Sequence, residues 1–268
     1  MLVMSGKRQA HLMFAVERRS RIMTLLNEKK SIFVQETAPL FGVTEETIRR
    51  DLKVLENQGL IVRTHGGAVL SDDVKAEFPL SIREGINISA KDAIGRHAAG
   101  LVNDGDTLIL DASTSSLYVA KYIKCKKGLT VITNAERVAL ELSECGEITV
   151  ICTGGTMRHS SLSYVGRVAE NALRNFHAEK VFFSCKGFTP SRGLTDSNEQ
   201  ESDLRKLMIG CSNTAVFLCD HSKLDKVGYV TTAQVEDIDL FVTDSETPPE
   251  WVEKIRSLGV GVEIAENI

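Results

Sequence analysis

The chain has 268 residues, of which 43% are apolar and 25% are charged, and its formal net charge is −4. This length allows two domains, and no apolar run approaches the roughly 20 residues of a membrane-spanning helix. The first residues lack the apolar segment of a secretory signal, and the six cysteines form no CxxC pair. The composition therefore predicts a cytoplasmic protein whose cysteines are small buried hydrophobes, not disulfides or zinc ligands.

The charge is distributed unevenly along the chain. Residues 1–70 contain 11 Lys+Arg and 7 Asp+Glu, a net charge of +4, whereas the remaining residues contain 21 and 29, a net charge of −8. A basic segment predicts a nucleic-acid partner for that part of the chain alone. A general RNA-binding protein is not favoured, because only 6% of the residues are aromatic and none are interleaved with a basic surface.

The regularly patterned part of the chain begins after residues 1–12, which are interpreted as a disordered extension, a vector remnant or the result of a misplaced start. Met13 would be a natural first residue. A helix is predicted over Phe14 to Lys29, where apolar residues recur at helical spacing. A short helix is predicted from Ile32 to Phe41, and Gly42 supplies a turn after it.

The stretch from Thr44 to Gly59 is predicted to be an amphipathic helix, with Thr44 as its N-cap and Gly59 as its left-handed end. Ile48, Leu52 and Leu55 recur at i, i+4 and i+7 and are expected to be buried. The opposite face carries guanidinium, ammonium, amide and hydroxyl groups, which match the base edges and phosphates of a DNA major groove. The alternative is an ordinary solvated helix face.

A helix, a glycine turn and a second helix form the helix-turn-helix pattern. The following run, Leu60 to Val69, is rich in β-formers and is broken by Gly66-Gly67, so it predicts a two-stranded wing. The side chains expected to contact DNA are Thr44, Glu46, Thr47, Arg49, Arg50, Lys53, Arg63 and His65.

Three stretches of this N-terminal part resemble one protein family. They are ERRSRIMTLL from Glu17, RRDL at Arg49 to Leu52, and QGLIVRTHGGA at Gln58 to Ala68. Together they are similar to the winged helix-turn-helix domain of the DeoR family of bacterial transcriptional regulators. The resemblance implies a DNA-binding domain over 14–70, with its helix-turn-helix at about 32–51, in a sequence-specific repressor of a sugar-catabolism operon.

The stretch 71–89 is polar, contains Pro79 and is predicted to be a linker before a second domain over 90–268. In the second domain apolar strands alternate with helices, which predicts an α/β fold with a mainly parallel sheet covered on both faces. The predicted strands are Thr107–Asp111, Leu129–Thr133, Ile148–Gly155, Lys180–Gly187, Asn213–Asp220, Asp239–Asp244 and Val260–Ile264. The predicted helices are Lys91–Val102, Ser115–Lys124, Asn134–Glu144, Leu162–Phe176, Asn198–Cys211 and one that ends at Leu258.

Polar residues gather where the predicted strands end, and open parallel sheets bind ligands beyond those ends. The run DASTSS, Asp111 to Ser116, is rich in hydroxyls and leads into a helix, which suits a phosphate or a carboxylate. Ordinary helix capping is the alternative. The expected effector-binding residues are Asp111, Ser113, Thr114, Ser115, Asn134, Gly154, Lys186, Asp196 and Lys223.

The family resemblance extends to this second domain. The sensor domain of the DeoR family is similar to ribose-5-phosphate isomerase, and DASTSS resembles the phosphate loop of that enzyme. The long stretch from Phe182 to Met208 also resembles the loop of the sensor domain. The resemblance implies that the effector is a phosphorylated sugar, which relieves repression.

A sugar-phosphate isomerase with a DNA-binding appendage is the alternative function. Isomerisation requires a carboxylate base, and the isomerases carry acidic residues in a GADE-like turn where this chain has Lys186. A lysine can hold an anion but cannot serve as that base, although Glu201 remains near the second acidic position. The domain is therefore expected to be a sensor without catalytic residues.

The expected partners are double-stranded operator DNA, a phosphorylated sugar and further copies of the chain. One winged domain contacts too little DNA for useful specificity, so a dimer or a tetramer is predicted. No cofactor is expected. No metal is expected either, because the histidines lack the spacing of metal ligands.

Overall fold

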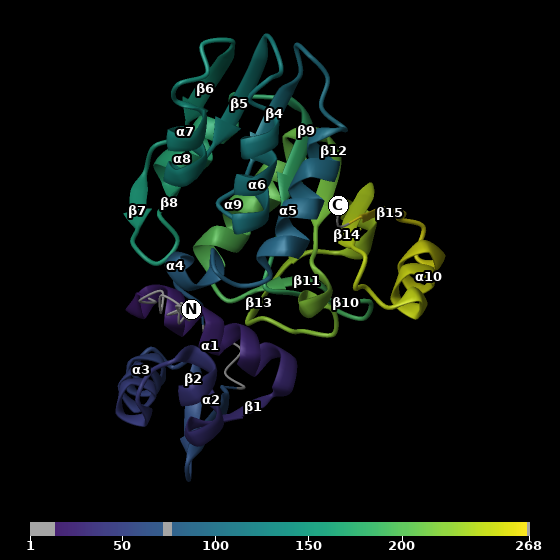
Figure 1. Ribbon diagram of the computed structural model, residues 1–268. Coiled ribbons are helices and arrows are strands. Elements are labelled where there is room, and N and C mark those ends of the chain that lie inside the picture. Colours follow the sequence, from purple (N-terminus) through teal and green to yellow (C-terminus); the bar gives the residue numbers. More distant parts are fainter. Residues whose placement is uncertain (1–13, 72–76, 267–268) are drawn as a thin grey trace, which may run out of the picture. The chain divides into compact units, whose positions relative to one another are not determined.

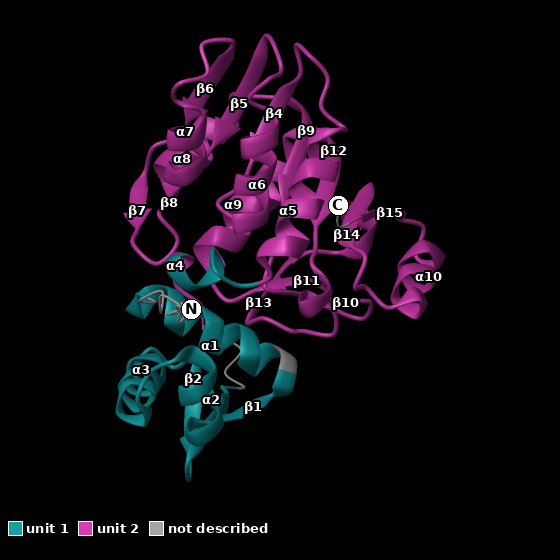
Figure 2. Ribbon diagram, viewed as in Figure 1, with its two compact units in different colours: residues 1–76, 81–86 teal, residues 77–80, 87–268 magenta. Residues whose placement is uncertain are grey.

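The computed structural model describes residues 14–71 and 77–266. It contains two compact units (Figure 2): the N-terminal unit consists of residues 1–76 and 81–86, and the C-terminal unit consists of residues 77–80 and 87–268. The chain therefore passes between the units more than once: residues 77–80 belong to the C-terminal unit, and the next residues, 81–86, belong to the N-terminal unit. Residues 1–12 lie outside the described part of the chain.

The N-terminal unit combines helices with a three-stranded antiparallel sheet of order β1-β3-β2 (Figure 1). Its elements are α1 (Ala15–Lys29), β1 (Ser31–Phe33), α2 (Val34–Phe41), α3 (Glu45–Asn57), β2 (Ile61–Thr64) and β3 (Gly67–Leu70), and α4 (Leu80–Arg83) follows. The first helix, the helix-turn-helix and the wing are thus where the sequence predicts them.

The start of the second predicted helix was wrong by two residues. Ile32 and Phe33 belong to β1, where they pair with Ala68 and Gly67 of β3 and extend the wing to three strands. A Cβ on Gly67 would lie 2.0 Å from the carbonyl oxygen of Ile32, so only glycine allows this approach. Helical periodicity does not reveal such a pairing, because the partners are more than thirty residues apart in sequence.

The C-terminal unit is built on a seven-stranded parallel sheet of order β15-β14-β12-β9-β4-β5-β6. Its strands are β4 (Thr107–Leu110), β5 (Leu129–Thr133), β6 (Ile148–Cys152), β9 (Ala178–Phe183), β12 (Ser212–Leu218), β14 (Leu240–Asp244) and β15 (Gly261–Ala265). Its helices are α5 (Ile88–Ala99), α6 (Thr114–Tyr122), α7 (Glu136–Leu142), α8 (Arg167–Leu173), α9 (Glu199–Gly210) and α10 (Pro249–Ser257). The predicted parallel α/β sheet is confirmed.

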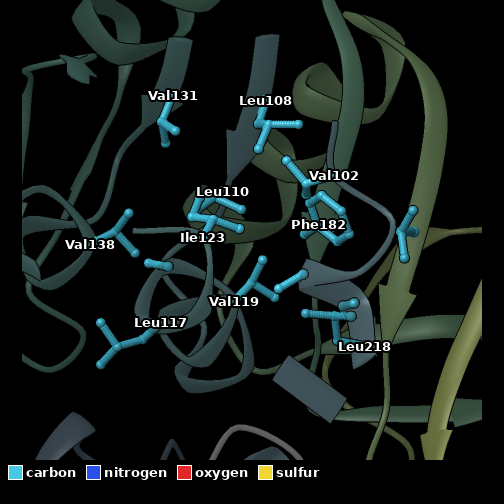
Figure 3. Close-up of a cluster of buried hydrophobic side chains, with 14 of the residues drawn as sticks. Val102, Leu108, Leu110, Leu117, Val119, Ile123, Val131, Val138, Phe182 and Leu218 are labelled. Atoms are coloured by element: carbon cyan, nitrogen blue, oxygen red, sulfur yellow. The ribbon is translucent and has the colours of Figure 1, made fainter. Parts of the chain in front are cut away.

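Two hydrophobic clusters cover the two faces of this sheet. On one face, Leu108, Leu110 and Phe182 pack with residues of α5, α6 and α7 (Figure 3). On the other face, Ile109 and Phe183 pack with residues of α8, α9 and α10. Successive strand residues point to opposite faces, so a continuous apolar run fills both clusters.

One predicted helix of the C-terminal unit was too long, and five short strands, β7, β8, β10, β11 and β13, were missed. Within the predicted helix Leu162–Phe176, the residues Ser163–Val165 form β8, which pairs with β7 (Thr156–Arg158). Leu162 and Gly166 have positive φ angles of 47° and 85°, so α8 begins only after them. The other three missed strands form a second antiparallel sheet, β10 (Gly187–Thr189), β11 (Gly193–Asp196) and β13 (Val230–Ala233). No helix among the described residues could cross a membrane.

Candidate DNA interface and effector site

Helix α3 is capped as its sequence requires. The backbone N–H of Thr47 donates to the Thr44 hydroxyl over 3.3 Å, and Gly42 ends α2 with a φ of +65°. Ile48 and Leu55 are fully buried. The predicted apolar stripe is therefore confirmed, and it fixes which face of α3 remains exposed.

The exposed face of α3 carries Arg49, Arg50 and Lys53. Arg49 pairs with Glu45 over 2.6 Å and Arg50 pairs with Glu46 over 3.3 Å, each one helical turn apart. Exposed pairs of this kind contribute only about 0.3–0.5 kcal/mol. They hold the arginines only weakly, so a phosphate or a base edge can replace the carboxylates.

The wing supplies a second set of exposed polar side chains. Arg63 lies at the end of β2, 3.9 Å from Glu56, and His65 lies in the turn between β2 and β3. Both side chains are exposed. Thr44, Glu46, Thr47 and the α3 cations therefore share one unit with the two predicted wing residues.

Sequence reasoning missed Asp51, which is 3% exposed on the apolar side of α3. Its carboxylate lies 2.5 Å from Arg18 Nε and 3.5 Å from Arg19 Nη1, both on α1. The pair fixes α3 against α1. The signal was an acidic residue at a position that helical spacing assigns to the buried stripe, between Ile48 and Leu52.

Replacing Asp51 by asparagine is expected to destabilise the N-terminal unit by about 1–3 kcal/mol, because a buried guanidinium loses its charged partner. Chemical unfolding followed by far-ultraviolet circular dichroism, which reports the loss of helix, measures this. Glu17→Gln, an exposed residue of α1 paired with Arg21, is the control and should change little. Equal stability of the two variants would show that Asp51 does not hold the helices together.

The C-terminal unit has its topological switch point between β4 and β9. The sheet runs from β4 through β5 to β6 on one side and from β9 through β12 and β14 to β15 on the other. In such sheets ligands bind beyond the carboxyl ends of the strands at the switch point. Asp111 follows β4 and Ser184 follows β9, so the strand order places both candidate turns there.

Asp111 is saturated with hydrogen bonds and braces the turn after β4. One carboxylate oxygen accepts from the backbone N–H of Ser113 over 3.0 Å and from the Ser116 hydroxyl over 2.6 Å. The other accepts from Ser184 N–H over 3.3 Å and from Arg205 Nε over 2.6 Å. Four donors on one carboxylate leave little capacity for a ligand.

Two buried polar atoms beside this turn lack a hydrogen-bond partner among the described residues. They are Oγ of Ser115 and Oδ1 of Asn134, whose residues are at most 1% exposed. The amide nitrogen of Asn134 donates to the Tyr164 carbonyl over 3.1 Å. A buried polar atom without a partner costs about 1–3 kcal/mol and is rare. The two atoms therefore mark where a bound polar molecule would find partners.

The remaining candidate residues are distributed around the strand ends. Lys223 Nζ donates to the Ser184 hydroxyl over 2.6 Å. Lys186 is half-buried, and its backbone N–H donates to the Thr195 carbonyl. Gly154, with a φ of +63°, lies in the turn after the edge strand β6, two strands away from β4.

Arg205 on α9 is the residue that connects the candidates, and sequence reasoning did not identify it. It is 5% exposed and lies 2.6 Å from both Asp111 and Asp196 and 3.7 Å from Glu201. Burial opposes its charge, but Asp196, Asp111 and Glu201 raise the pKa of Arg205 above its ordinary value. A charged residue on the buried side of an otherwise amphipathic helix was the available signal.

Glu201 is likewise held in its ionised form. Burial opposes this charge, but Arg205 and the hydroxyls of Ser163 and Ser161 lower the pKa of Glu201. Arg158 Nη1 donates to it over 2.9 Å. A carboxylate with this many donors is a poor general base.

His221, Asp244 and Glu246 are close enough together for a cation, but Asp244 is already used by the protein. Its oxygens accept from the backbone N–H of His221 over 2.8 Å, from His221 Nδ1 over 2.9 Å and from the backbone N–H of Glu246 over 3.0 Å. The arrangement fits a histidine–carboxylate pair that anchors the turn after β12. The hydrogen bond with Asp244 raises the pKa of His221.

This pair makes stability depend on pH in a defined direction. Because the folded pKa of His221 is raised, its contribution is fully present below the unfolded value of about 6.5 and is lost as the pH rises through the folded pKa. We expect the loss of melting temperature caused by His221→Gln to be larger at about pH 6 than at about pH 9. His177→Gln, an exposed histidine, is the control. A loss that does not depend on pH would contradict the ionic pair.

Comparisons with known proteins agree with both parts of the chain. Residues 18–74 match the model of the DeoR-like helix-turn-helix domain. Residues 86–245 match the model of the DeoR C-terminal sensor domain.

Relatives match over nearly the whole length. An uncharacterised HTH-type transcriptional regulator, YulB of Bacillus subtilis, is 41% identical over 93% of this chain and 96% of its own. The HTH-type transcriptional regulator GolR of Listeria innocua is 38% identical over 95% and 100%. The transcriptional repressor AccR of Agrobacterium fabrum is 33% identical over 89% and 95%.

Among solved structures, ribose 5-phosphate isomerase A from Methanocaldococcus jannaschii aligns with 52% of this chain and 55% of its own at a TM-score of 0.39 and 15% identity. A likeness at that level carries no information on activity. The relatives that match along the whole chain are regulators, which confirms the prediction of a regulator over that of an enzyme. The chain belongs to the DeoR family of DNA-binding transcriptional regulators.

Proposed function

We propose that this regulator is a cytoplasmic repressor of a sugar-catabolism operon, and that a phosphorylated sugar bound in the C-terminal unit releases it from its operator. The observation that carries the effector part is the pair of unpartnered buried atoms, Ser115 Oγ and Asn134 Oδ1, beside the switch point of a parallel sheet. Relatives named as repressors support the sign of the response.

The DNA contacts are proposed to come from α3 and the wing. The exposed side of α3 would enter the major groove, where Arg49, Arg50 and Lys53 reach guanine edges or phosphates. Arg63 and His65 of the wing would contact the backbone beside the groove. Thr44, Glu46 and Thr47 lie at the N-terminal end of α3, the end of a recognition helix that contacts base edges in helix-turn-helix proteins.

The effector is proposed to place its phosphate on the turn before α6. The backbone N–H groups of Thr114 and Ser115 lie in the first turn of that helix, where an anion is stabilised. Lys186 and Lys223 would supply positive charge. Hydroxyls of the sugar would donate to Asn134 Oδ1 and pair with Ser115 Oγ, which would satisfy both atoms.

The chain is further proposed to act as a homo-oligomer. Two winged domains related by symmetry can contact paired half-sites, which multiplies the specificity of one domain. Sedimentation at micromolar concentration tests this. A monomer both with and without operator would contradict it.

The function is tested in two steps. Selection of protein-bound duplexes from a random library should yield one operator sequence. A thermal-shift screen should then show that pentose or hexose phosphates raise the melting temperature, because a ligand that binds the folded state stabilises it. The same sugars without phosphate and inorganic phosphate alone are the controls. A protein that no sugar phosphate stabilises would contradict the effector assignment.

Ser115→Ala separates a ligand contact from a structural hydroxyl. Removal of an unpartnered buried hydroxyl should leave the ligand-free melting temperature unchanged or raise it. The stabilisation by the sugar phosphate should fall, since the ligand loses one partner. Ser143→Ala, an exposed serine at the C-terminal end of α7, should affect neither. A Ser115→Ala variant that melts earlier but responds fully would identify the hydroxyl as structural.

A further inference from the structure

The connector, residues 77–87, is attached to the C-terminal unit at both of its ends. Residues 77–80 belong to that unit, and 81–86 belong to the N-terminal unit. Asn87 belongs again to the C-terminal unit, where its side-chain amide donates to Asp220 over 2.8 Å. The six residues that return to the N-terminal unit are therefore bracketed by two attachments to the sensor.

The first attachment is an ion pair between Glu77 and Arg158 of β7. Nη1 and Nη2 of Arg158 donate to the two carboxylate oxygens of Glu77 over 3.2 and 2.6 Å. Next to it, the backbone N–H of Leu80 donates to the Ser160 carbonyl over 2.8 Å. Bidentate guanidinium–carboxylate pairs combine strength with a fixed geometry, so Glu77 defines the path of the connector.

Arg158 is also the outer member of a chain of ion pairs that reaches the candidate effector site. Its Nη1 donates to Glu201 over 2.9 Å, and Glu201 lies 3.7 Å from Arg205. Arg205 in turn binds Asp111 and Asp196 over 2.6 Å each. Two candidate effector residues are thus linked to the connector through three intervening charged side chains.

The contacts of Arg158 can be redistributed. Nη1 has two hydrogens, yet Glu77, Ser161 and Glu201 all lie within 3.2 Å of it. If Glu77 leaves, the hydroxyl of Ser161 and the carboxylate of Glu201 still satisfy this nitrogen. Nη1 therefore keeps two partners, whereas Nη2, whose contact is Glu77, turns to water.

The charge balance decides which carboxylate would leave. In the ion pairs that these two arginines form among the described residues, Arg158 and Arg205 face four carboxylates, a surplus of two negative charges. The side chain of Glu77 is 22% exposed, whereas those of Glu201 and Asp111 are 6% and 1% exposed. Glu77 can return to water at the lowest cost in desolvation.

We propose that Glu77 is a releasable clamp through which the effector site controls the connector. Without effector, the Glu77–Arg158 pair holds residues 77–80 on the sensor. A phosphorylated sugar at the strand ends adds negative charge to a cluster that already has a surplus, and Glu77 gives up Arg158. The connector then loses one attachment. DNA affinity falls, because the state with Glu77 released binds the operator less tightly than the state with Glu77 paired to Arg158. The control by effector rests on the proposed function, whereas the clamp itself does not.

The test compares Glu77→Gln with Glu253→Gln, an exposed glutamate of α10 that serves as the matched control. Hydrogen exchange of the peptide covering 77–83 should be about tenfold faster in Glu77→Gln, because a local opening no longer breaks a charge-assisted pair. The affinity of Glu77→Gln for the selected operator should fall to that of the wild-type protein saturated with sugar phosphate. Sugar phosphate should then change the affinity of this variant by less than about twofold.

Wild-type exchange and wild-type operator affinity in Glu77→Gln would overturn the clamp, whatever the ligands do. A wild-type protein that releases DNA with sugar phosphate but shows no faster exchange at 77–83 would overturn its control by the effector. If no sugar phosphate in the panel changes operator affinity of the wild-type protein, the proposed effector fails. The exchange comparison then decides on the clamp alone.

Discussion

Replacing Arg205 by methionine is expected to destabilise the C-terminal unit by about 3–5 kcal/mol, the cost of removing one partner from a buried ionic group. The methionine fills a similar volume, so the loss is electrostatic. Asp111 and Asp196 would each lose the guanidinium that lies 2.6 Å away, and Glu201 would keep its ion pair with Arg158. Urea unfolding at neutral pH measures the effect.

The neighbouring Lys206→Met on α9 is the control, because Lys206 is exposed and pairs with the exposed Asp203 over 3.1 Å. It should cost less than about 1 kcal/mol. An Arg205 variant as stable as the Lys206 variant would show that the carboxylates do not depend on the guanidinium.

The Arg49→Ala, Arg50→Ala double variant is expected to lose most of its operator affinity. Each arginine that reads a guanine contributes about 1–3 kcal/mol, so the loss is roughly thirtyfold to twenty-five-thousandfold if the two add. Both side chains are exposed, 48% and 79%, so folding should be unaffected. Fluorescence anisotropy with the selected operator and with a scrambled duplex measures this.

The salt dependence separates the two kinds of contact. An arginine that binds only phosphate should weaken all sequences alike and lower the salt slope by about one unit. Arg21→Ala with Lys29→Ala, two exposed cations of α1, is the charge-matched control. If the α3 variant binds the operator as the control does, α3 is not the recognition element.

Local patterns predicted the elements that local physics determines. The apolar stripe Ile48, Leu52 and Leu55 and the cap Thr44 specify α3, because helix spacing and capping act within a few residues. Apolar strands that alternate with helices specify the parallel sheet in the same way. The polar turns at the strand ends could also be found, since each turn follows its own strand directly.

Pairings between distant segments could not be found from such patterns. The strand that contains Ile32 exists because Ala68 and Gly67 pair with it, and the short strands β10, β11 and β13 stabilise one another. Each is three or four residues long, too short for an apolar period to show. Tertiary pairing therefore overrode local preference.

The sequence by itself determined a basic DNA-binding domain with an amphipathic recognition helix, an α/β sensor and the hydroxyl-rich turn at Asp111 to Ser116. Only the tertiary structure decided that Asp111 forms an ion pair with Arg205 and that Asp51 is buried against Arg18. It also decided that the unpartnered Ser115 lies beside the switch point. The reason is physical: periodicity assigns a residue to a face, but the partner of a buried charge comes from another element, and strand order chooses that element.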